Sequence, residues 1–383
     1  MKRKLSLALT AAAIAVIVLL SLFLAQNWFS ENKEVPREFY VGVMFAYDHE
    51  ISQVKALVDK VKNYTNLFVL GSVDLFHNET ALTEACDYVA DANLNFIVQF
   101  RGLDLYTYNI TDWMQFAHER YGSQFLGVYR YDEPGGRQLD GTPDIQLINS
   151  TAAGANPTYA SVTEAYVGNL SAFPCYYLQF APQIFTADYG LYWYSYQAGY
   201  SGILAEFVGN ESRERHIALC RGAADAYGRD WGVIITWKYN QPPYLESGDE
   251  LYNDLALAYS SGAKYAVVFS YPETGQYGTL TEEHFSAMER FWNMLYANPD
   301  SFGKNSAEAA YVVPADYGFG FRSGIDIIWG LFPPDNNSAK IYYDIQTLTE
   351  RYGAKVDILY DGPEATATLA NYSNIYFWNK TVN

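Results

Sequence analysis

The sequence FLGVYRYDEPGG, residues 125–136, decides the predicted fold. Residues 125–131 form an apolar and aromatic run that predicts a buried strand. The strand must end by Pro134-Gly135-Gly136, because proline lacks the N–H group that a central strand needs. Two carboxylates, Asp132 and Glu133, come directly before this stop. In a closed barrel of parallel strands, side chains at that position form the floor of the active site.

Strand and helix patterns alternate on both sides of this stretch. Strict alternation implies parallel strands joined by right-handed crossovers. Eight such pairs within residues 38–298 predict a (β/α)8 barrel, the TIM-barrel fold, which usually has about 250 residues. A doubly wound open sheet is the alternative, but Phe45-Ala46-Tyr47-Asp48 is unlike its glycine-rich loop. The predicted strands are residues 39–47, 67–72, 96–100, 125–131, 184–189, 202–208, 231–239 and 265–271.

Residues 299–383 form a further predicted unit after the barrel. Strand patterns at residues 309–313, 356–360 and 375–378 accompany an amphipathic helix at residues 338–352. This small α/β unit is similar to the flavodoxin-like appendages of some barrel hydrolases. We expect it to serve in packing or in homo-oligomerisation.

Residues 1–37 are predicted to form a signal anchor and a tether. Lys2-Arg3-Lys4 precedes an uncharged apolar run over residues 5–25. A spanning helix needs about 20 such residues, whereas signal peptides have apolar cores of about 7–15. The basic side stays in the cytoplasm, so we expect a single-pass cell-membrane protein whose bulk is extracytoplasmic. A cleaved signal ending near Ala25, which gives a secreted protein, is the alternative.

Nine N-x-S/T sequons agree with export and predict a glycoprotein. Some of these asparagines can instead be helix caps, because they precede predicted helices. The sequons begin at Asn63, Asn78, Asn109, Asn149, Asn169, Asn210, Asn336, Asn371 and Asn379.

The composition restricts the class of partner. A formal net charge of −18 argues against nucleic acid, whose phosphate backbone needs basic patches. The three cysteines form no CxxC pair and the five histidines no HxH pair, so we expect neither a metal site nor a cofactor. Among 35 Tyr, 22 Phe and 8 Trp, most are expected in the core. Some can line a cleft and stack on the apolar faces of sugars.

Carboxylates dominate the side chains expected at the carboxyl ends of the strands. Such a ring suits glycoside hydrolysis, in which a protonated acid and a base or nucleophile flank the sugar bond. Glu206 stands in an apolar strand, where a bare carboxylate is costly, so it must be reactive or paired with Arg130 or Lys238. Arg130 itself is expected to face the barrel interior in an ion pair. The candidate site residues are Asp48, Arg101, Asp132, Glu133, Asp188, Glu206, Trp237, Lys238 and Glu273.

Asp132-Glu133-Pro134 resembles the Asn-Glu-Pro motif that ends the fourth strand in the large (β/α)8 glycoside hydrolase superfamily. The resemblance implies that Glu133 is the general acid/base and that Asp132 replaces the residue contacting the sugar 2-hydroxyl. In that superfamily the nucleophilic Glu ends the seventh strand, where this chain has Thr236-Trp237-Lys238-Tyr239. Glu206 is therefore the expected base or nucleophile, followed by Asp188 and Glu273.

Three functions fit these observations. The first is an extracytoplasmic, membrane-anchored glycoside hydrolase whose catalytic residues are Glu133 and Glu206, with the other candidates binding a carbohydrate. The second is an inactive barrel that binds glycans or serves as a cell-surface structural or interaction protein. The third, a metal-dependent deacetylase or amidohydrolase, is disfavoured by the histidine pattern. A Glu133–Glu206 carboxyl separation of about 5–10 Å across an open cleft would favour hydrolysis, and a sealed direct contact would oppose it.

Overall fold

The computed structural model describes residues 39–102, 105–141, 146–149, 151–152, 154–298 and 301–382. The predicted anchor and tether lie outside these residues. No helix within the described ranges is both long and apolar enough to cross a membrane.

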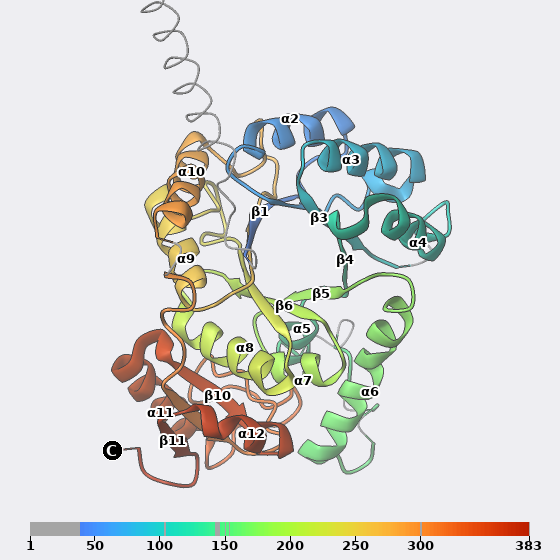
Figure 1. Ribbon diagram of the computed structural model, residues 1–383. Coiled ribbons are helices and arrows are strands. Elements are labelled where there is room, and N and C mark those ends of the chain that lie inside the picture. The colour runs from blue at the N-terminus through green and yellow to red at the C-terminus, as the bar shows by residue number, and fades with distance from the viewer. Residues whose placement is uncertain are drawn as a thin grey trace, which may run out of the picture.

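Eight parallel strands form a closed barrel in chain order, which confirms the predicted (β/α)8 architecture (Figure 1). The strands are β1 (Tyr40–Phe45), β2 (Leu67–Leu70), β3 (Asn95–Phe100), β4 (Phe125–Arg130), β5 (Ile184–Asp188), β6 (Gly202–Phe207), β7 (Asp230–Ile235) and β8 (Tyr265–Phe269). The doubly wound alternative is wrong, because β1 pairs with β8 and leaves no open edge.

Helices surround the barrel and alternate with its strands along the chain. They are α2 (Ile51–Val61), α3 (Glu79–Asp91), α4 (Ile110–Tyr121), α5 (Pro134–Leu139), α6 (Tyr159–Tyr177), α7 (Tyr192–Gln197), α8 (Arg213–Tyr227), α9 (Gly248–Ser260) and α10 (Glu282–Ala297). The short helix α5 is a feature that the sequence did not predict. It begins directly after Glu133 and so fixes the direction in which the chain leaves β4.

Strand β4 is irregular, and this irregularity corrects one prediction. Gly127 has φ 144°, and a Cβ there would lie 2.2 Å from the Gln183 carbonyl oxygen. The register against β3 also shifts at this point, so that Leu126 and Tyr129 both face the barrel interior. The predicted inward ion pair of Arg130 is therefore wrong. Its guanidinium lies outside, 5.1 Å from the Phe173 ring centre.

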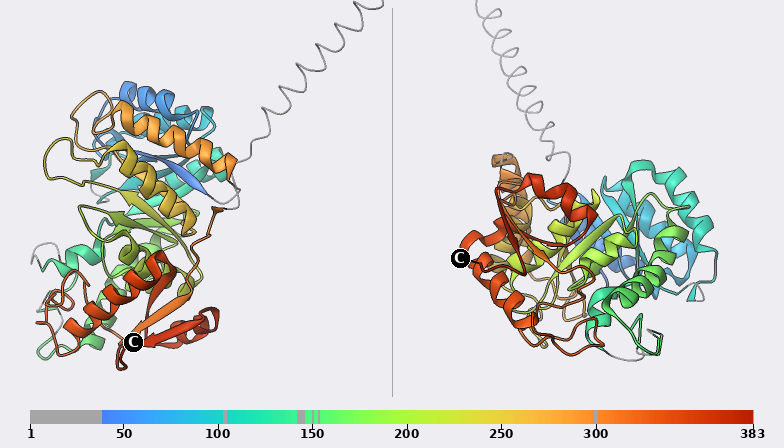
Figure 2. Two further views of the ribbon diagram at one scale, coloured as in Figure 1. Left: turned by 90° about the vertical axis from the view of Figure 1, so that its left-hand side faces the viewer. Right: turned by 90° about the horizontal axis from the view of Figure 1, so that it is seen from below.

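The C-terminal unit contains a parallel three-stranded sheet in the order β10-β9-β11. Its elements are β9 (Ala309–Val313), α11 (Ser338–Tyr352), β10 (Val356–Tyr360), α12 (Pro363–Thr368) and β11 (Asn374–Phe377). Barrel helix α8 packs on β10, and Figure 2 shows the unit against this side of the barrel. A Cβ on Gly222 of α8 would lie 2.7 Å from the Ile358 oxygen, so glycine permits this close approach.

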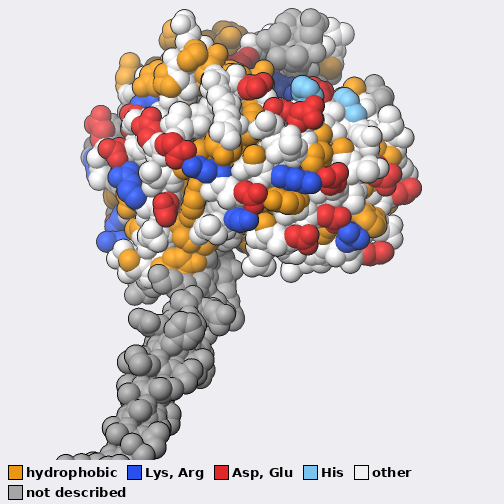
Figure 3. Space-filling view, turned by 90° about the horizontal axis from the view of Figure 1, so that it is seen from above, with side chains coloured by type: hydrophobic (Ala, Val, Ile, Leu, Met, Phe, Trp, Pro, Cys, Tyr) orange, Lys and Arg blue, Asp and Glu red, His pale blue; other side chains and the backbone are white. Residues whose placement is uncertain are grey.

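The surface carries mixed charges. Figure 3 shows one face on which acidic and basic side chains are interspersed and do not gather into a basic patch. Of the cysteines, Cys86 and Cys220 are buried and Cys175 is exposed.

Candidate active site

A cavity of about 590 Å³ lies at the carboxyl ends of the barrel strands. Every strand or the turn after it contributes to its lining, because parallel strands direct their carboxyl ends to one rim. Six of the predicted site residues line it, namely Asp48, Arg101, Asp132, Glu133, Glu206 and Trp237.

The other three predicted site residues do not line the cavity. Ala187 faces the barrel interior, so the neighbouring Asp188 points outward and is fully buried. Lys238 forms an ion pair with Glu250 of α9. Glu273 is exposed to solvent beyond β8.

Asp188 holds the start of α5. Its carboxylate accepts the backbone N–H groups of Gly135 (2.6 Å), Gly136 (2.8 Å), Tyr189 (2.8 Å) and Gly190 (3.2 Å). Burial raises the pKa of Asp188 to about 8, and the N–H groups of Gly135 and Gly136 oppose that rise. The arrangement gives Asp188 a role in positioning the chain after Glu133.

Glu133 occupies a left-handed backbone conformation, with φ 52° and ψ 47°. Its N–H donates to the Ala187 carbonyl at 3.0 Å, which fixes the corner against β5. A non-glycine residue in this region is strained and persists only where its surroundings hold it. The side chain is 31% exposed, and the Arg137 Nε lies 3.6 Å from its carboxylate.

Glu206 faces the barrel interior and is only 6% exposed. Its carboxyl group lies within hydrogen-bonding reach of Glu133. Two carboxylates in such contact cannot both ionise, so the pair holds one proton. The predicted alternative, an ion pair with Arg130 or Lys238, is wrong, because Arg130 points outward and Lys238 binds Glu250. The contact is not sealed, since both glutamates line the cavity.

The surroundings place that proton on Glu206. Burial, and then the nearby Glu133 and Asp132 carboxylates, raise the pKa of Glu206 well above its ordinary value. Burial and Asp132 also raise the pKa of Glu133, but the Arg137 guanidinium opposes this rise. Glu133 is therefore the ionised and more exposed member of the pair.

Tyr129 is a site residue that the sequence analysis missed. Its hydroxyl donates to the Asp132 carboxylate and accepts the Ala187 N–H at 3.0 Å. Asp132 also lies 3.4 Å from the Arg137 Nη2. The signal for Tyr129 was Gly127, because a glycine inside a strand often marks a bulge that changes which side chains face inward.

Two polar side chains of different strands line the cavity wall. Gln99 on β3 is 7% exposed and lines the cavity. Thr236 follows β7, and its buried Oγ1 has no hydrogen-bond partner among the described residues. A buried unpaired polar group is costly, which suits a site that a ligand completes. Gln99 could have been found as the polar residue in the apolar strand NFIVQF.

One wall of the cavity is aromatic. Trp237 and Tyr271 lie nearly parallel, with ring centres 6.0 Å apart and planes at 22°. The Trp237 Nε1 donates to the Tyr271 carbonyl oxygen at 2.5 Å, which holds the indole in place. Asp48 and Arg101 lie elsewhere on the lining. Among the described residues, no group of three or more His, Cys, Asp or Glu side chains could hold a metal ion.

Fold and site together define a (β/α)8 barrel with an acidic cavity at the carboxyl end of its strands. No protein-family model and no curated protein matches the chain. The pneumococcal virulence factor StrH is 8% identical, over 69% of this chain and 85% of that chain, at a TM-score of 0.44. The O-GlcNAc hydrolase of Thermobaculum terrenum is 12% identical, over 70% of this chain and 64% of that chain, at a TM-score of 0.38.

A biosynthetic protein is similar to the same degree. The spore coat polysaccharide biosynthesis protein spsE of Bacillus subtilis is 9% identical, over 68% of this chain and 69% of that chain, at a TM-score of 0.38. At these identities and TM-scores, the similarities carry no conclusion about activity.

Proposed function

We propose that the protein is a glycoside hydrolase-like enzyme that cleaves a carbohydrate in the cavity of its barrel. The observation that carries the proposal is the pair Glu133–Glu206, whose carboxyl groups meet at the floor of an open cavity, where burial raises the pKa of both. Glycoside hydrolysis requires one protonated acid and one ionised carboxylate at the scissile bond. A one-proton pair supplies both.

The free site must rearrange before catalysis. A direct contact is closer than the separation of about 5–5.5 Å that a retaining mechanism uses. We propose that the sugar enters between the two carboxyl groups and that the proton crosses from Glu206 to Glu133 as they part. Glu133 then protonates the leaving oxygen as the glycosidic bond breaks, and the ionised Glu206 faces the positive charge that develops on the sugar ring. That charge offsets the cost of ionising the buried Glu206. A water molecule then bonds to the anomeric carbon and gives its proton to Glu206, which restores the starting pair.

The other groups of the cavity would bind the substrate. Gln99 and Thr236 offer polar atoms of the cavity lining to sugar hydroxyls, and the Thr236 Oγ1 has no partner among the described residues. Trp237 with Tyr271 offers an aromatic surface to an apolar sugar face. Asp132 is held beside Glu133 by Tyr129 and Arg137, where it could accept a hydroxyl hydrogen bond.

A second candidate function is glycan binding without turnover. Two observations favour it: the glutamate pair is in direct contact in the free site, and no carboxylate follows β7 within Thr236-Trp237-Lys238-Tyr239. In that case the cavity would bind a sugar through the same polar and aromatic groups.

We further propose that the protein is exported, glycosylated and held at the cell membrane by its N-terminal segment. The support is the basic and apolar pattern of residues 2–25 together with the sequons. All nine sequon asparagines are exposed, as attached glycans require. Asn78 and Asn109 also cap α3 and α4 through their side chains. Site-by-site mass spectrometry of the native protein would test the glycans.

A substrate screen on the full chain tests the activity. We expect wild type to hydrolyse one class of glycoside, and Glu133→Gln and Glu206→Gln each to lower kcat by at least about 100-fold, the usual range for an acid or base. Glu273→Gln is the matched control, because Glu273 is exposed and lies outside the cavity lining. It should leave kcat within about twofold of wild type.

The same screen separates the two candidates. Turnover that survives both glutamate substitutions would contradict the catalytic pair. Saturable glycan binding by wild type with no turnover, unchanged in Glu133→Gln, would select the binding function.

A further inference from the structure

We infer that the strap loop, residues 314–337 of the C-terminal unit, positions Glu133 relative to Glu206 by holding the chain segments that follow β4 and β6. The inference rests on the proposed function, which makes these two residues the catalytic pair. It assigns a role in the site to a unit that the sequence suggested for packing or homo-oligomerisation. The homo-oligomer itself stays a prediction.

The strap loop holds the segment that follows Glu133. The buried Gln138 of α5 donates through its Nε2 to the Trp329 oxygen at 2.8 Å. A Cβ on Gly330, which has φ 66°, would lie 1.9 Å from the Gln138 carbonyl oxygen. Arg322 donates to Asp140, one residue beyond α5, at 2.6 Å. Helix α5 is therefore tied at its carboxyl end to residues that lie about 190 positions later in the chain.

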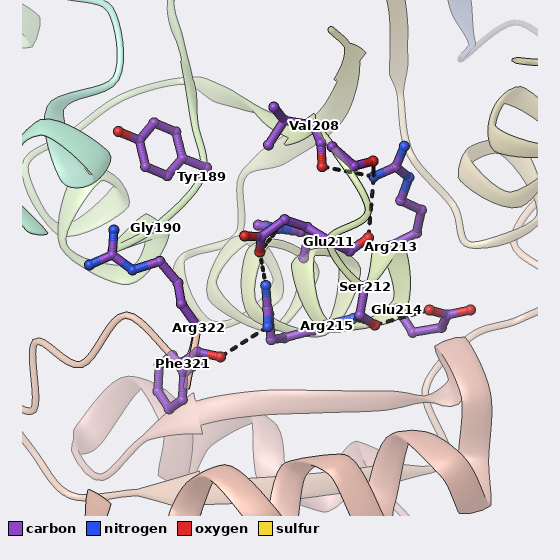
Figure 4. A network of polar contacts seen from close by, with 12 residues as sticks. Tyr189, Gly190, Val208, Glu211, Ser212, Arg213, Glu214, Arg215, Phe321 and Arg322 are labelled. Carbon is purple, nitrogen blue, oxygen red and sulfur yellow. Dashed lines mark hydrogen bonds and ion pairs between the residues drawn. The ribbon is translucent and has the colours of Figure 1, made fainter. Parts of the chain in front are cut away.

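The strap loop also holds the segment that follows Glu206. Arg215 in the first turns of α8 donates to the Phe321 oxygen at 3.0 Å and pairs with Glu211 in the turn after β6 (Figure 4). The pKa of Glu211 is lowered to about 2, first by the hydrogen bond with His216 and then by Arg215, so Glu211 stays ionised. Phe321 and Arg322 are neighbours, so one short stretch contacts both segments.

The strap loop is part of the protein core between these two contacts. Trp329 is fully buried and lies against Tyr194 of α7, with ring centres 4.6 Å apart. Strand β5 separates β4 from β6 in the barrel, so no strand ladder joins β4 directly to β6. A rigid connection outside the barrel therefore adds a constraint on the Glu133–Glu206 spacing that the sheet alone does not supply.

The substitution Gly330→Ala tests this role. The added methyl group clashes with the Gln138 backbone and must displace either α5 or the strap loop. Gly353→Ala is the matched control, since Gly353 also has positive φ, 58°, but has nothing within 4 Å of its added Cβ. Both variants place an alanine at positive φ, and only Gly330→Ala contacts the segment after Glu133.

The readout is the titration of the two glutamates in the full chain. Carboxyl signals in selectively ¹³C-labelled protein can be assigned with Glu133→Gln and Glu206→Gln. In wild type and in Gly353→Ala, we expect the pair to titrate in two steps more than about one pH unit apart. In Gly330→Ala we expect the steps to converge, and kcat on any substrate found to fall by about 100-fold.

Arg322→Ala provides a second variant if Gly330→Ala does not fold. It removes the tie to Asp140, and we expect the two steps to converge. Arg290→Ala, which removes an exposed ion pair on α10, is its control. If folded Gly330→Ala titrates in two steps as wild type does, the strap role is overturned. If Gly330→Ala does not fold, the same result in Arg322→Ala overturns it. Two separate steps in wild type without turnover of any glycan would instead refute the proposed hydrolase and leave the strap role intact.

Discussion

Glu206 and Asp188 are buried carboxylates on neighbouring strands, yet their surroundings give them different chemistry. Four backbone N–H groups surround the Asp188 carboxylate, which thereby becomes part of the scaffold. Glu206 has another carboxyl group as its neighbour and an open cavity beside it. A buried acid whose neighbour competes for the same proton is poised for proton transfer. The groups that surround each carboxylate, rather than its degree of burial, give the two residues different chemistry.

The raised pKa of Glu206 predicts a pH dependence of stability. Above its ordinary value of 4.5, the folded protein keeps a proton that the unfolded chain has released. The resulting stabilisation is complete below about pH 4.5 and is lost as pH rises towards the folded-state pKa. Urea unfolding at about pH 5 and about pH 8 should show that the free energy of unfolding falls less between these pH values in Glu206→Gln than in wild type.

Buried acids remote from the pair, such as Asp357 of β10, contribute equally to both proteins and cancel in this comparison. The exposed Glu273→Gln should follow wild type across the same pH range. If the free energy of unfolding depends on pH equally in wild type and in Glu206→Gln, that result would contradict the shared proton.

At the scale of the element, α5 is too short to form on its own, and its position depends on groups at both ends. Asp188 binds the N–H groups of its first turn, and the strap loop binds its carboxyl end. Short isolated helices are marginal in water. The left-handed backbone of Glu133 therefore persists because the elements around it leave no alternative.

Asp188→Ala should lower the free energy of unfolding by about 3–5 kcal/mol, because it leaves several buried N–H groups without an acceptor. Chemical denaturation measures the loss. Amide exchange at Gly135 and Gly136 should also accelerate in the folded variant. Asp249→Ala is the control at an exposed site on α9, and its effect should stay within about 0.5 kcal/mol. A similarly small effect of Asp188→Ala would return Asp188 to the list of substrate-binding candidates.

At the scale of the whole molecule, helix α8 belongs to two cores. It covers the barrel on one side and packs on β10 of the C-terminal sheet. The buried Arg221 of α8 binds Asp357 of β10 at 2.9 Å and donates to the Ala354 oxygen at 2.6 Å. Tyr372 donates to the second Asp357 oxygen at 2.9 Å. We therefore expect the barrel and the C-terminal unit to unfold together.

Asp357→Ala should lower stability by about 3–5 kcal/mol and keep a single unfolding transition, because it leaves Arg221 buried without its counter-charge. Calorimetry with far- and near-ultraviolet circular dichroism measures both features. Glu308→Ala, which breaks an exposed pair with Lys355 in the same unit, should cost less than about 1 kcal/mol. Two separate transitions, or equal effects of the two substitutions, would contradict the shared core.

The sequence by itself determined the order and kind of the strands and of the longer helices. Runs such as GILAEF in β6 and the periodicity of α11 are local patterns, and they predicted each barrel strand to within a few residues. It also placed Glu133 and Glu206 at the cavity, because both were assigned to the carboxyl ends of strands, which meet at one rim of a parallel barrel.

Only the tertiary structure decided which groups meet. The bulge at Gly127 turned Tyr129 inward and Arg130 outward, and the outward face of β5 buried Asp188 beneath α5. The ties from Trp329 and Phe321 join residues more than 100 positions apart. The hydrophobic periodicity of the sequence does not predict such contacts, because they depend on how separate elements pack after each has formed.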